Sequence, residues 1–269
     1  EAGITKRSIS AFALALLVSP LFAQRGSAPE PTLPQVLREY QPVTAERLLN
    51  PDEQNWLMIR RTYDGWGFSP LAEFTPANVA RLRQVWRVPT DEPKVHEAAP
   101  VVNNGVMFVS TPNNQVMALN AVTGELLWRY RRPRPKDVFV LHDTNRGVSL
   151  YADKVFYAAA EAVLVALDAR TGKEVWTRTV ADNKSAYYIT LAPLVAGGKV
   201  MVGASGGEFG VRGFVAAFDP DSGKELWRTY TVPAPGEKGS ETWPKGDQWK
   251  TGGAPVWVTG NYDPENNIA

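Results

Sequence analysis

One hairpin pattern occurs three times in the chain, and it constrains the fold more than any other sequence feature. Each copy has an apolar stretch, an Asn or Asp, a Gly four residues later, and a second stretch that ends in Trp. The copies occupy residues 116–128, 164–176 and 215–227, with their closing tryptophans about 50 residues apart. A repeat of this length is typical of similar units that stack on one another.

The residue types in each copy predict a β-hairpin. An Asn or Asp side chain can hydrogen-bond to the backbone of a turn, and the Gly after it supplies the positive φ that reverses the chain. These pairs are Asn120 with Gly124, Asp168 with Gly172 and Asp219 with Gly223. We interpret the closing residues Trp128, Trp176 and Trp227 as structural, each docking between neighbouring units.

Two further short apolar stretches precede each hairpin. They span residues 99–102 and 106–110, 147–151 and 154–158, and 191–195 and 199–203. Four strands in a period of about 50 residues form a blade of a β-propeller, whereas a helical solenoid would need a 3.6-residue period. We therefore predict an all-β fold of four-stranded antiparallel blades, with about four blades present. Because an open propeller exposes apolar faces, we expect the chain to be the amino-terminal half of a longer protein.

Composition excludes several classes of function. The 269 residues carry 29 Lys and Arg against 28 Asp and Glu, without a long run of one charge, so no nucleic-acid-binding arm or polybasic membrane patch is predicted. The chain has no Cys, which excludes disulfides, thiolate metal sites, iron–sulfur clusters, attached haem and thiol nucleophiles. Its two histidines, His96 and His142, are too few for a histidine-rich metal centre.

The first residues resemble a secretory signal. Lys6 and Arg7 precede an apolar run over residues 9–22, which is short and interrupted for a membrane span, although an uncleaved anchor is the alternative. We predict a signal peptide over residues 1–23, export to a periplasm, a flexible leader over 24–45 and propeller from 46 to 269. Short helices are expected after Thr44 and over residues 75–83.

Polar loops between the repeats are candidates for a ligand site. Glu97 precedes an inner strand and could accept a ligand hydrogen bond, or be an ordinary solvated Glu. Arg146, at the equivalent place in the next unit, could clamp a carboxylate or form a salt bridge between blades. Thr190 is a candidate donor, and His96 and His142 are interpreted as ordinary polar residues rather than catalytic ones.

A Gly-rich loop over residues 203–213 gives a stronger signal. Its backbone amides at Ser205, Gly206 and Gly207 could approach an anion closely, and Glu208 would place a hard oxygen ligand beside them. The loop matches neither a Walker nor a dinucleotide motif, and an ordinary Gly-rich turn is the alternative. Trp257 interrupts the Trp spacing and could be the floor on which a flat cofactor stacks.

Together these segments resemble the periplasmic quinoprotein alcohol dehydrogenases, which use pyrroloquinoline quinone (PQQ). The resemblance runs from about Asn55 to the end and is carried by residues 61–71, 78–86, 145–148, 205–213, 231–236, 240–244 and 261–265. It implies an eight-bladed propeller with PQQ and one metal ion, Ca²⁺ or a lanthanide, on its axis. The implied reaction is oxidation of an alcohol or a related hydroxyl or aldehyde substrate.

The resemblance also implies roles for particular residues. Glu97, Arg146 and Thr190 would hydrogen-bond PQQ, backbone amides of Ser205, Gly206 and Gly207 would hold a carboxylate, and Trp257 would stack beneath the ring. Glu208 would contact PQQ and be a metal ligand. The catalytic Asp and the other metal ligands would lie beyond Ala269, so this chain alone is expected to be inactive. Electrons would pass to a cytochrome c or a membrane quinone, and a homodimer is allowed.

Two substitutions depart from the family pattern. Val140 and Leu141 stand where many members have a Cys-Cys disulfide over PQQ, and Pro255 stands where some have a Thr that contacts it. The alternative hypothesis is a non-catalytic propeller of the outer-membrane assembly type. Such a scaffold would have the same hairpins but no reason to gather Glu97, Arg146, Glu208 and Trp257 in one pocket.

Overall fold

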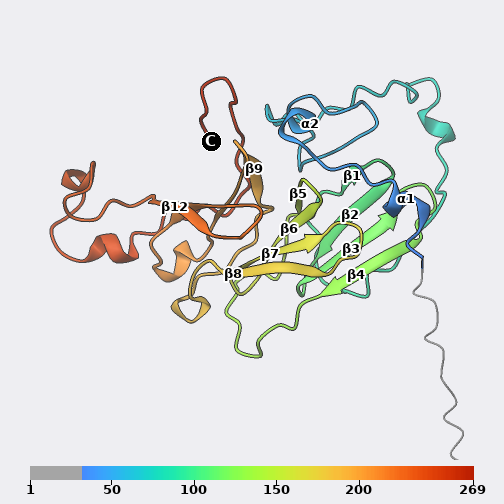
Figure 1. Ribbon diagram of the computed structural model, residues 1–269. Coiled ribbons are helices and arrows are strands. Elements are labelled where there is room, and N and C mark those ends of the chain that lie inside the picture. The colour runs from blue at the N-terminus through green and yellow to red at the C-terminus, as the bar shows by residue number, and fades with distance from the viewer. Residues whose placement is uncertain (1–31) are drawn as a thin grey trace, which may run out of the picture. The chain divides into compact units, whose positions relative to one another are not determined.

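Twelve β-strands in three sheets dominate the computed structural model, which describes residues 32–269 (Figure 1). The all-β prediction is confirmed, and the helices are two short α-helices, α1 (Gln35–Arg38) and α2 (Ala45–Leu49), with five 3₁₀ turns. The strands are β1 (Val101–Asn103), β2 (Val106–Thr111), β3 (Gln115–Asn120), β4 (Leu126–Arg131), β5 (Ser149–Tyr151), β6 (Lys154–Ala159), β7 (Val163–Asp168), β8 (Glu174–Thr179), β9 (Leu194–Ala196), β10 (Lys199–Gly203), β11 (Phe214–Phe218) and β12 (Glu225–Tyr230).

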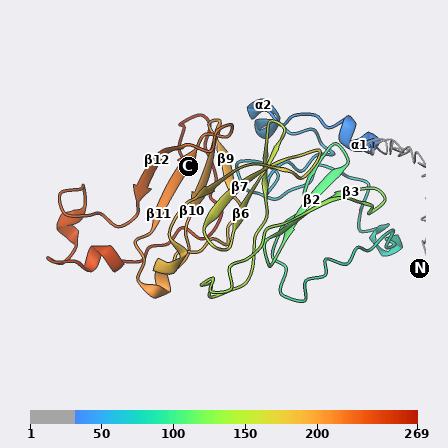
Figure 2. The same cartoon turned by 60° about the horizontal axis from the view of Figure 1, so that its bottom comes forward.

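Each sheet has four antiparallel strands in sequence order, and the three sheets lie side by side (Figures 1 and 2). The predicted strands are confirmed to within a few residues. A β-bulge also recurs at the same place in every sheet. It shifts the register between the last two strands after Ala118, Ala166 and Ala217. We call the sheets β1–β4, β5–β8 and β9–β12 the first, second and third blades.

The outer hairpin turns are built as the sequence predicts. The Asn120 carboxamide oxygen accepts hydrogen bonds from the backbone N–H groups of Val122 and Thr123, at 2.9 and 3.1 Å. Asp168 and Asp219 cap their own turns in the same way. The Gly that follows has φ between +66° and +75° in all three turns.

Tryptophans join the blades. The Nε1–H of Trp128 donates to the Ala169 carbonyl of the second blade at 3.0 Å, and Trp176 donates to Pro220 of the third at 3.1 Å. Trp86, which precedes the first copy of the repeat, docks on the first blade in the same way and donates to Ala121 at 3.2 Å. Trp227 differs from the expectation, because 38% of it is exposed and no later turn covers it among the described residues.

An amino-terminal strap crosses two blades. We give this name to residues 33–58, whose side chains Leu37, Val43 and Leu48 belong to the same buried core as the sheets. Its backbone bridges Val43 with Ala152 of the second blade and Trp56 with Val102 of the first. The expectation of a flexible leader is therefore wrong for residues 33–45, because their apolar side chains are packed; residues 24–31, like the predicted signal peptide, lie outside the described residues.

Two other expectations need correction. The helix expected over residues 75–83 is a 3₁₀ turn, Val79–Arg81, because the Asn78 side chain bonds to the backbone of Thr75 and Glu73 instead. The expected start of a fourth blade is not formed, since the described residues after Tyr230 contain no β-strand beyond isolated bridges.

Among the described residues no helix has the length and apolar character needed to cross a membrane.

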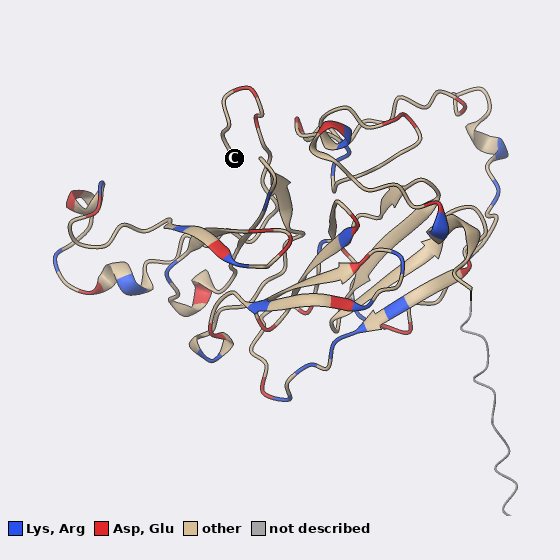
Figure 3. Cartoon of the chain, in the orientation of Figure 1, with Lys and Arg blue, Asp and Glu red and all other residues tan. Residues whose placement is uncertain are grey.

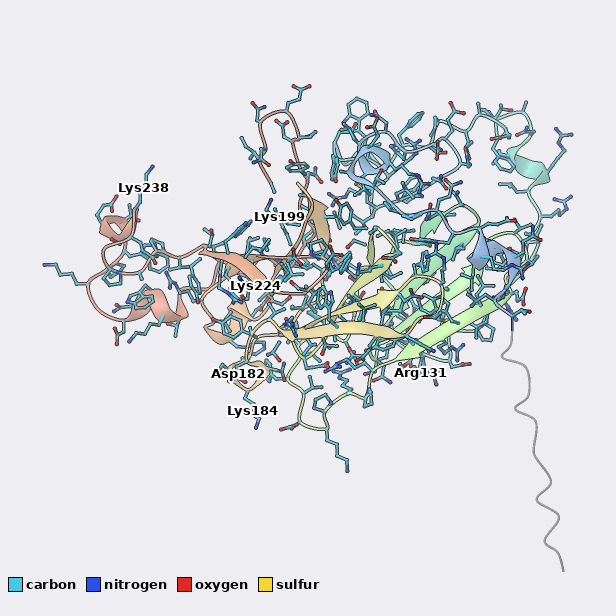
Figure 4. The ribbon with its side chains drawn as sticks, viewed as in Figure 1. Arg131, Asp182, Lys184, Lys199, Lys224 and Lys238 are labelled. Atoms are coloured by element: carbon cyan, nitrogen blue, oxygen red, sulfur yellow. The ribbon has the colours of Figure 1, made fainter. Side chains whose placement is uncertain are left out.

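The segment 231–251 projects from the third blade and is pinned by one arginine. The Arg212 guanidinium lies over Tyr230 and Trp249, 3.8 and 4.8 Å from the ring centroids, and forms a 2.7 Å salt bridge with Glu237. Figure 4 labels Lys238 on the outer part of this segment. Blue and red residues are interspersed along the ribbon in Figure 3, in keeping with the balanced composition.

Candidate cofactor site

Loops that precede the inner strands of the second and third blades meet around one polar pocket. Its cavity volume is about 150 Å³. Three loops and the segment 255–257 contribute its lining residues, which are His142, Arg146, Tyr188, Thr190, Ser205, Gly206, Glu208, Pro255 and Trp257. Six of the eight predicted site residues are in this lining.

Arg146 brings a seventh, Glu97, to the pocket. The two side chains form a salt bridge of 2.8 Å, and the Arg146 guanidinium lies 4.9 Å from the ring centroid of Trp257. The backbone N–H of Arg146 donates to the Thr190 carbonyl at 3.0 Å, which joins the two loops. The loop is fixed from beneath by buried Asn145, whose side chain donates to Ala158. Arg146 is thus held as a cation between a carboxylate and an aromatic face.

Two buried hydroxyls lie beside this cation. Thr190 and Ser205 are only 4% and 3% exposed, and their side-chain oxygens are 3.2 Å apart. The expectation that the Ser205 backbone amide holds a carboxylate is wrong, because this N–H donates to the Tyr188 carbonyl at 2.8 Å, so only the Ser205 hydroxyl faces a ligand. The Thr190 hydroxyl is also 3.3 Å from the Trp257 carbonyl, so it ties the third blade to the segment that carries the indole. Trp257 itself is half-exposed.

The Gly-rich loop needs its glycines for close approach. Gly206 has φ +112°, and a Cβ there would lie 2.3 Å from the Ala186 carbonyl oxygen. A Cβ on Gly207 would lie 2.6 Å from the Pro255 ring, so this eighth predicted residue packs against the pocket wall. The turn η3 (Gly207–Phe209) then presents Glu208, an exposed carboxylate without a salt bridge among the described residues. The departure at Pro255 is thus accommodated by a glycine opposite it.

Sequence reasoning missed Tyr188 as a lining residue and gave His142 no site role. Burial, with the negative charge of Glu208, raises the pKa of Tyr188, while Arg146 acts in the opposite direction. Tyr188 could have been found from its spacing, because it lies two residues before Thr190 in extended backbone and so faces the same side. His96, by contrast, is bonded to Thr90 and to the Lys94 carbonyl, as an ordinary polar residue would be.

Val140 and Leu141, which stand where the resemblance implies a Cys-Cys pair, lie in the loop between the first and second blades. The neighbouring Phe139 packs edge to face on Phe209, with ring centroids 4.4 Å apart. Asn183 fixes this loop by hydrogen bonds to the backbone N–H and carbonyl of Phe139, both at 2.9 Å. Figure 4 labels Asp182 and Lys184 on either side of Asn183, at the turn η2 (Asn183–Ser185).

A larger hollow of about 380 Å³ lies at the third blade, but its chemistry is unsuitable for an anionic ligand. It is lined by apolar residues such as Leu191, Met201 and Trp227, and no ionisable side chain contributes to it. The smaller pocket around Arg146 combines a cation, hydroxyls and an indole. We therefore assign the candidate site to the smaller pocket.

The residues present fit PQQ, a flat and acidic quinone. Arg146 offers positive charge, the Thr190 and Ser205 hydroxyls offer hydrogen-bonding groups, and Trp257 offers a flat aromatic face. The described residues do not form a complete metal site, since they contain no group of three or more His, Cys, Asp or Glu able to hold a metal ion. Glu208 could therefore be one ligand of a larger set.

The PQQ-dependent "glucose/ethanol/alcohol dehydrogenase, beta-propeller domain" family matches residues 56–269. The chain belongs to this family. The quinoprotein alcohol dehydrogenase PedH of Pseudomonas putida is 40% identical, over 76% of this chain and 37% of PedH. The 1-butanol dehydrogenase (cytochrome c) of Thauera butanivorans is 44% identical, over 65% of this chain and 26% of that enzyme.

A solved structure of the family supports the architecture. The europium-containing methanol dehydrogenase has a TM-score of 0.76 and 34% identity, over 82% of this chain and 42% of that one. The chain thus spans roughly a quarter to two fifths of these relatives' lengths. The resemblance inferred from the interleaved motifs is confirmed at the level of family and fold.

Proposed function

We propose that the protein oxidises an alcohol, or a related hydroxyl or aldehyde substrate, with PQQ and a bound metal ion. One observation carries the proposal: Glu97, Arg146, Glu208 and Trp257, which are far apart in sequence, gather at one pocket. The relatives named as quinoprotein and cytochrome c-linked alcohol dehydrogenases support the same reaction class. A scaffold propeller would not require this convergence.

The chain's own residues would bind and orient the cofactor. Arg146 would pair with an acidic or quinone oxygen, and its salt bridge to Glu97 and contact with Trp257 would fix the guanidinium in place. The hydroxyls of Thr190 and Ser205 would add hydrogen-bonding groups, the amides of Gly206 and Gly207 would add donors, and Trp257 would offer a stacking surface. When bound, PQQ would supply the acceptor of the substrate's hydride, and the metal ion would polarise a quinone carbonyl.

Glu208 is the metal ligand that we propose for this chain. Its carboxylate suits Ca²⁺ and lanthanides alike, because both prefer hard oxygen donors. A europium-containing relative supports the second possibility. The remaining ligands and the catalytic Asp are expected outside residues 1–269, so we expect this stretch alone not to turn over substrate.

The electron acceptor and the location of the protein are part of the same proposal. A cytochrome c acceptor is favoured by the relative named for one, and a membrane quinone is the other candidate. Export to the periplasm rests on the signal-like sequence over residues 1–23.

Reconstitution tests the proposal. The purified full-length protein, freed of cofactor, should gain dye-linked alcohol oxidation when PQQ is added with Ca²⁺ or La³⁺. Glu208→Gln should lower the activity at least about a hundredfold, because the metal loses an anionic ligand. Glu125→Gln, in the exposed outer turn of the first blade, is the matched control and should retain full activity. Absence of PQQ binding by the wild-type protein would refute the proposal.

A further inference from the structure

Tyr188 is a buried residue of the pocket whose hydroxyl has no hydrogen-bond partner among the described residues. The residue is only 3% exposed, yet it lines the cavity that holds Arg146 and Glu208. Its hydroxyl makes no hydrogen bond to any residue that the structure describes, and it is not among the fully enclosed polar atoms. Tyr188 is therefore a buried side chain at the pocket whose hydroxyl is not fully enclosed and is free to bond to a ligand.

The backbone holds Tyr188 firmly beside the Gly-rich loop. Its carbonyl accepts a hydrogen bond from the Ser205 N–H at 2.8 Å, in an isolated antiparallel bridge. Thr190 follows two residues later and points to the same pocket. Tyr188, Thr190 and Ser205 thus contribute three hydroxyl-bearing side chains to the lining of one pocket.

The charges around the phenol define what it can bind. Glu208 and Arg146 are the ionisable side chains that act on it electrostatically. A phenol that remains protonated is a hydrogen-bond donor, and a donor beside an arginine complements an acidic ligand. The adjacent Tyr187 differs, because its hydroxyl already donates to the Arg212 carbonyl at 3.0 Å and accepts from the Arg212 N–H at 3.1 Å.

We propose that Tyr188 is a further cofactor-contact residue, whose phenol donates a hydrogen bond to an anionic oxygen of PQQ in the pocket of Arg146 and Glu208. The inference rests on the proposed function and deepens it. The Tyr188 phenol would add one hydrogen-bond donor to the pocket that Thr190 and Ser205 also line. It also explains why a tyrosine with an unused hydroxyl lies buried at this wall.

Calorimetric titration of PQQ into the cofactor-free full-length protein, with and without Ca²⁺, tests the inference. Tyr188→Phe should weaken PQQ binding about tenfold in both conditions, because one hydrogen bond to a charged group is lost. Its melting temperature should match that of the wild type, since no intramolecular hydrogen bond is removed. Tyr187→Phe is the matched control: it should melt at a lower temperature but bind PQQ normally.

The outcomes separate the inference from the proposed function. If the wild type binds PQQ and Tyr188→Phe binds it equally well, the inference is wrong and the proposed function stands. A loss of affinity seen only with Ca²⁺ would also overturn it, since Tyr188 would then act by positioning Glu208. If the wild type binds no PQQ, the proposed function itself fails.

Discussion

At the scale of single residues, one glycine in each outer turn serves two purposes. Gly172 has φ +69°, which lets the chain reverse, and its missing side chain makes room for the Trp128 ring of the preceding blade. A Cβ on Gly172 would lie 2.6 Å from that ring. Gly124 and Gly223 have the same relation to Trp86 and Trp176. The turn and the contact between blades therefore depend on the same absent atom.

Gly172→Ala should lower the free energy of unfolding by about 3 kcal/mol or more, because strain at positive φ is added to a clash with a buried indole. Gly236→Ala is the control, since Gly236 has φ +89° but a Cβ on it would meet no other atom within 4 Å. That variant should lose only about 1 kcal/mol. Urea denaturation measures both, and equal losses would contradict the argument.

At the scale of elements, the loop between the first and second blades is held by charge. Asp143 forms salt bridges with Lys94 and with Arg134, the latter at 2.6 Å. Burial opposes its ionisation, but the hydrogen bonds from Lys94 and Arg134 hold the pKa of Asp143 below its ordinary value of 3.8. This anchor lies three residues before Arg146 and helps to position the pocket's cation.

Asp143→Asn should cost about 2 kcal/mol of unfolding free energy at neutral pH. Because the folded-state pKa is depressed, the carboxylate stabilises the fold above the unfolded pKa, and this contribution disappears as pH falls through the folded value. The difference between wild type and variant should therefore be constant from pH 7 to about 5 and shrink below about 4. Denaturation at several pH values measures it; a difference that does not change with pH would contradict the assignment.

A matched control is Asp137→Asn in the same loop. Asp137 is exposed and forms no salt bridge among the described residues. The variant should have the stability of the wild type at every pH tested.

The strands were predictable but the loop contacts were not. The apolar pattern of a strand and the Asn or Asp of its turn lie within a few residues of each other and recur in every repeat. The strands and Asx turns could therefore be inferred from local sequence alone. Asp143 instead finds Lys94, 49 residues earlier, and Glu97 finds Arg146 from another loop. Such pairs form because the blades stack and bring distant loops together. The local sequence does not show which loops will meet, and only the family resemblance indicated it. Tyr188 was not predicted because the resemblance pointed to Thr190 in the same segment and implied no role for the tyrosine.

At the scale of the whole described chain, the strap over residues 33–58 joins the first two blades. Residues 25–45 are rich in Pro, Ala and Glu, a composition that favours a flexible leader, but the apolar residues Leu37, Tyr40 and Val43 within them are buried. Arg170 of the second blade donates to the Tyr40 carbonyl at 3.0 Å. Composition describes the average of a segment, whereas packing depends on a few side chains within it.

Leu48→Ala should lower the free energy of unfolding by about 3 kcal/mol, because it opens a cavity in the core that the strap shares with the sheets. Leu49→Ala is the control in the same helix. Leu48 is 1% exposed and Leu49 is 46% exposed, so the second variant should lose less than about 1 kcal/mol. Thermal and urea unfolding measure the pair, and similar losses would show that the strap is not part of the core.

The tryptophan contacts between blades are directional. Each blade receives an indole at its outer turn, from Trp86, Trp128 and Trp176 in succession, and the first two blades each supply the indole that the next one receives. Such a head-to-tail contact joins two different surfaces. A duplicated unit therefore already carries both the indole and the glycine turn that its neighbours need. Gene duplication can lengthen such an array without inventing a new interface, and the rotation from one unit to the next, rather than the contact, determines how many units close a ring.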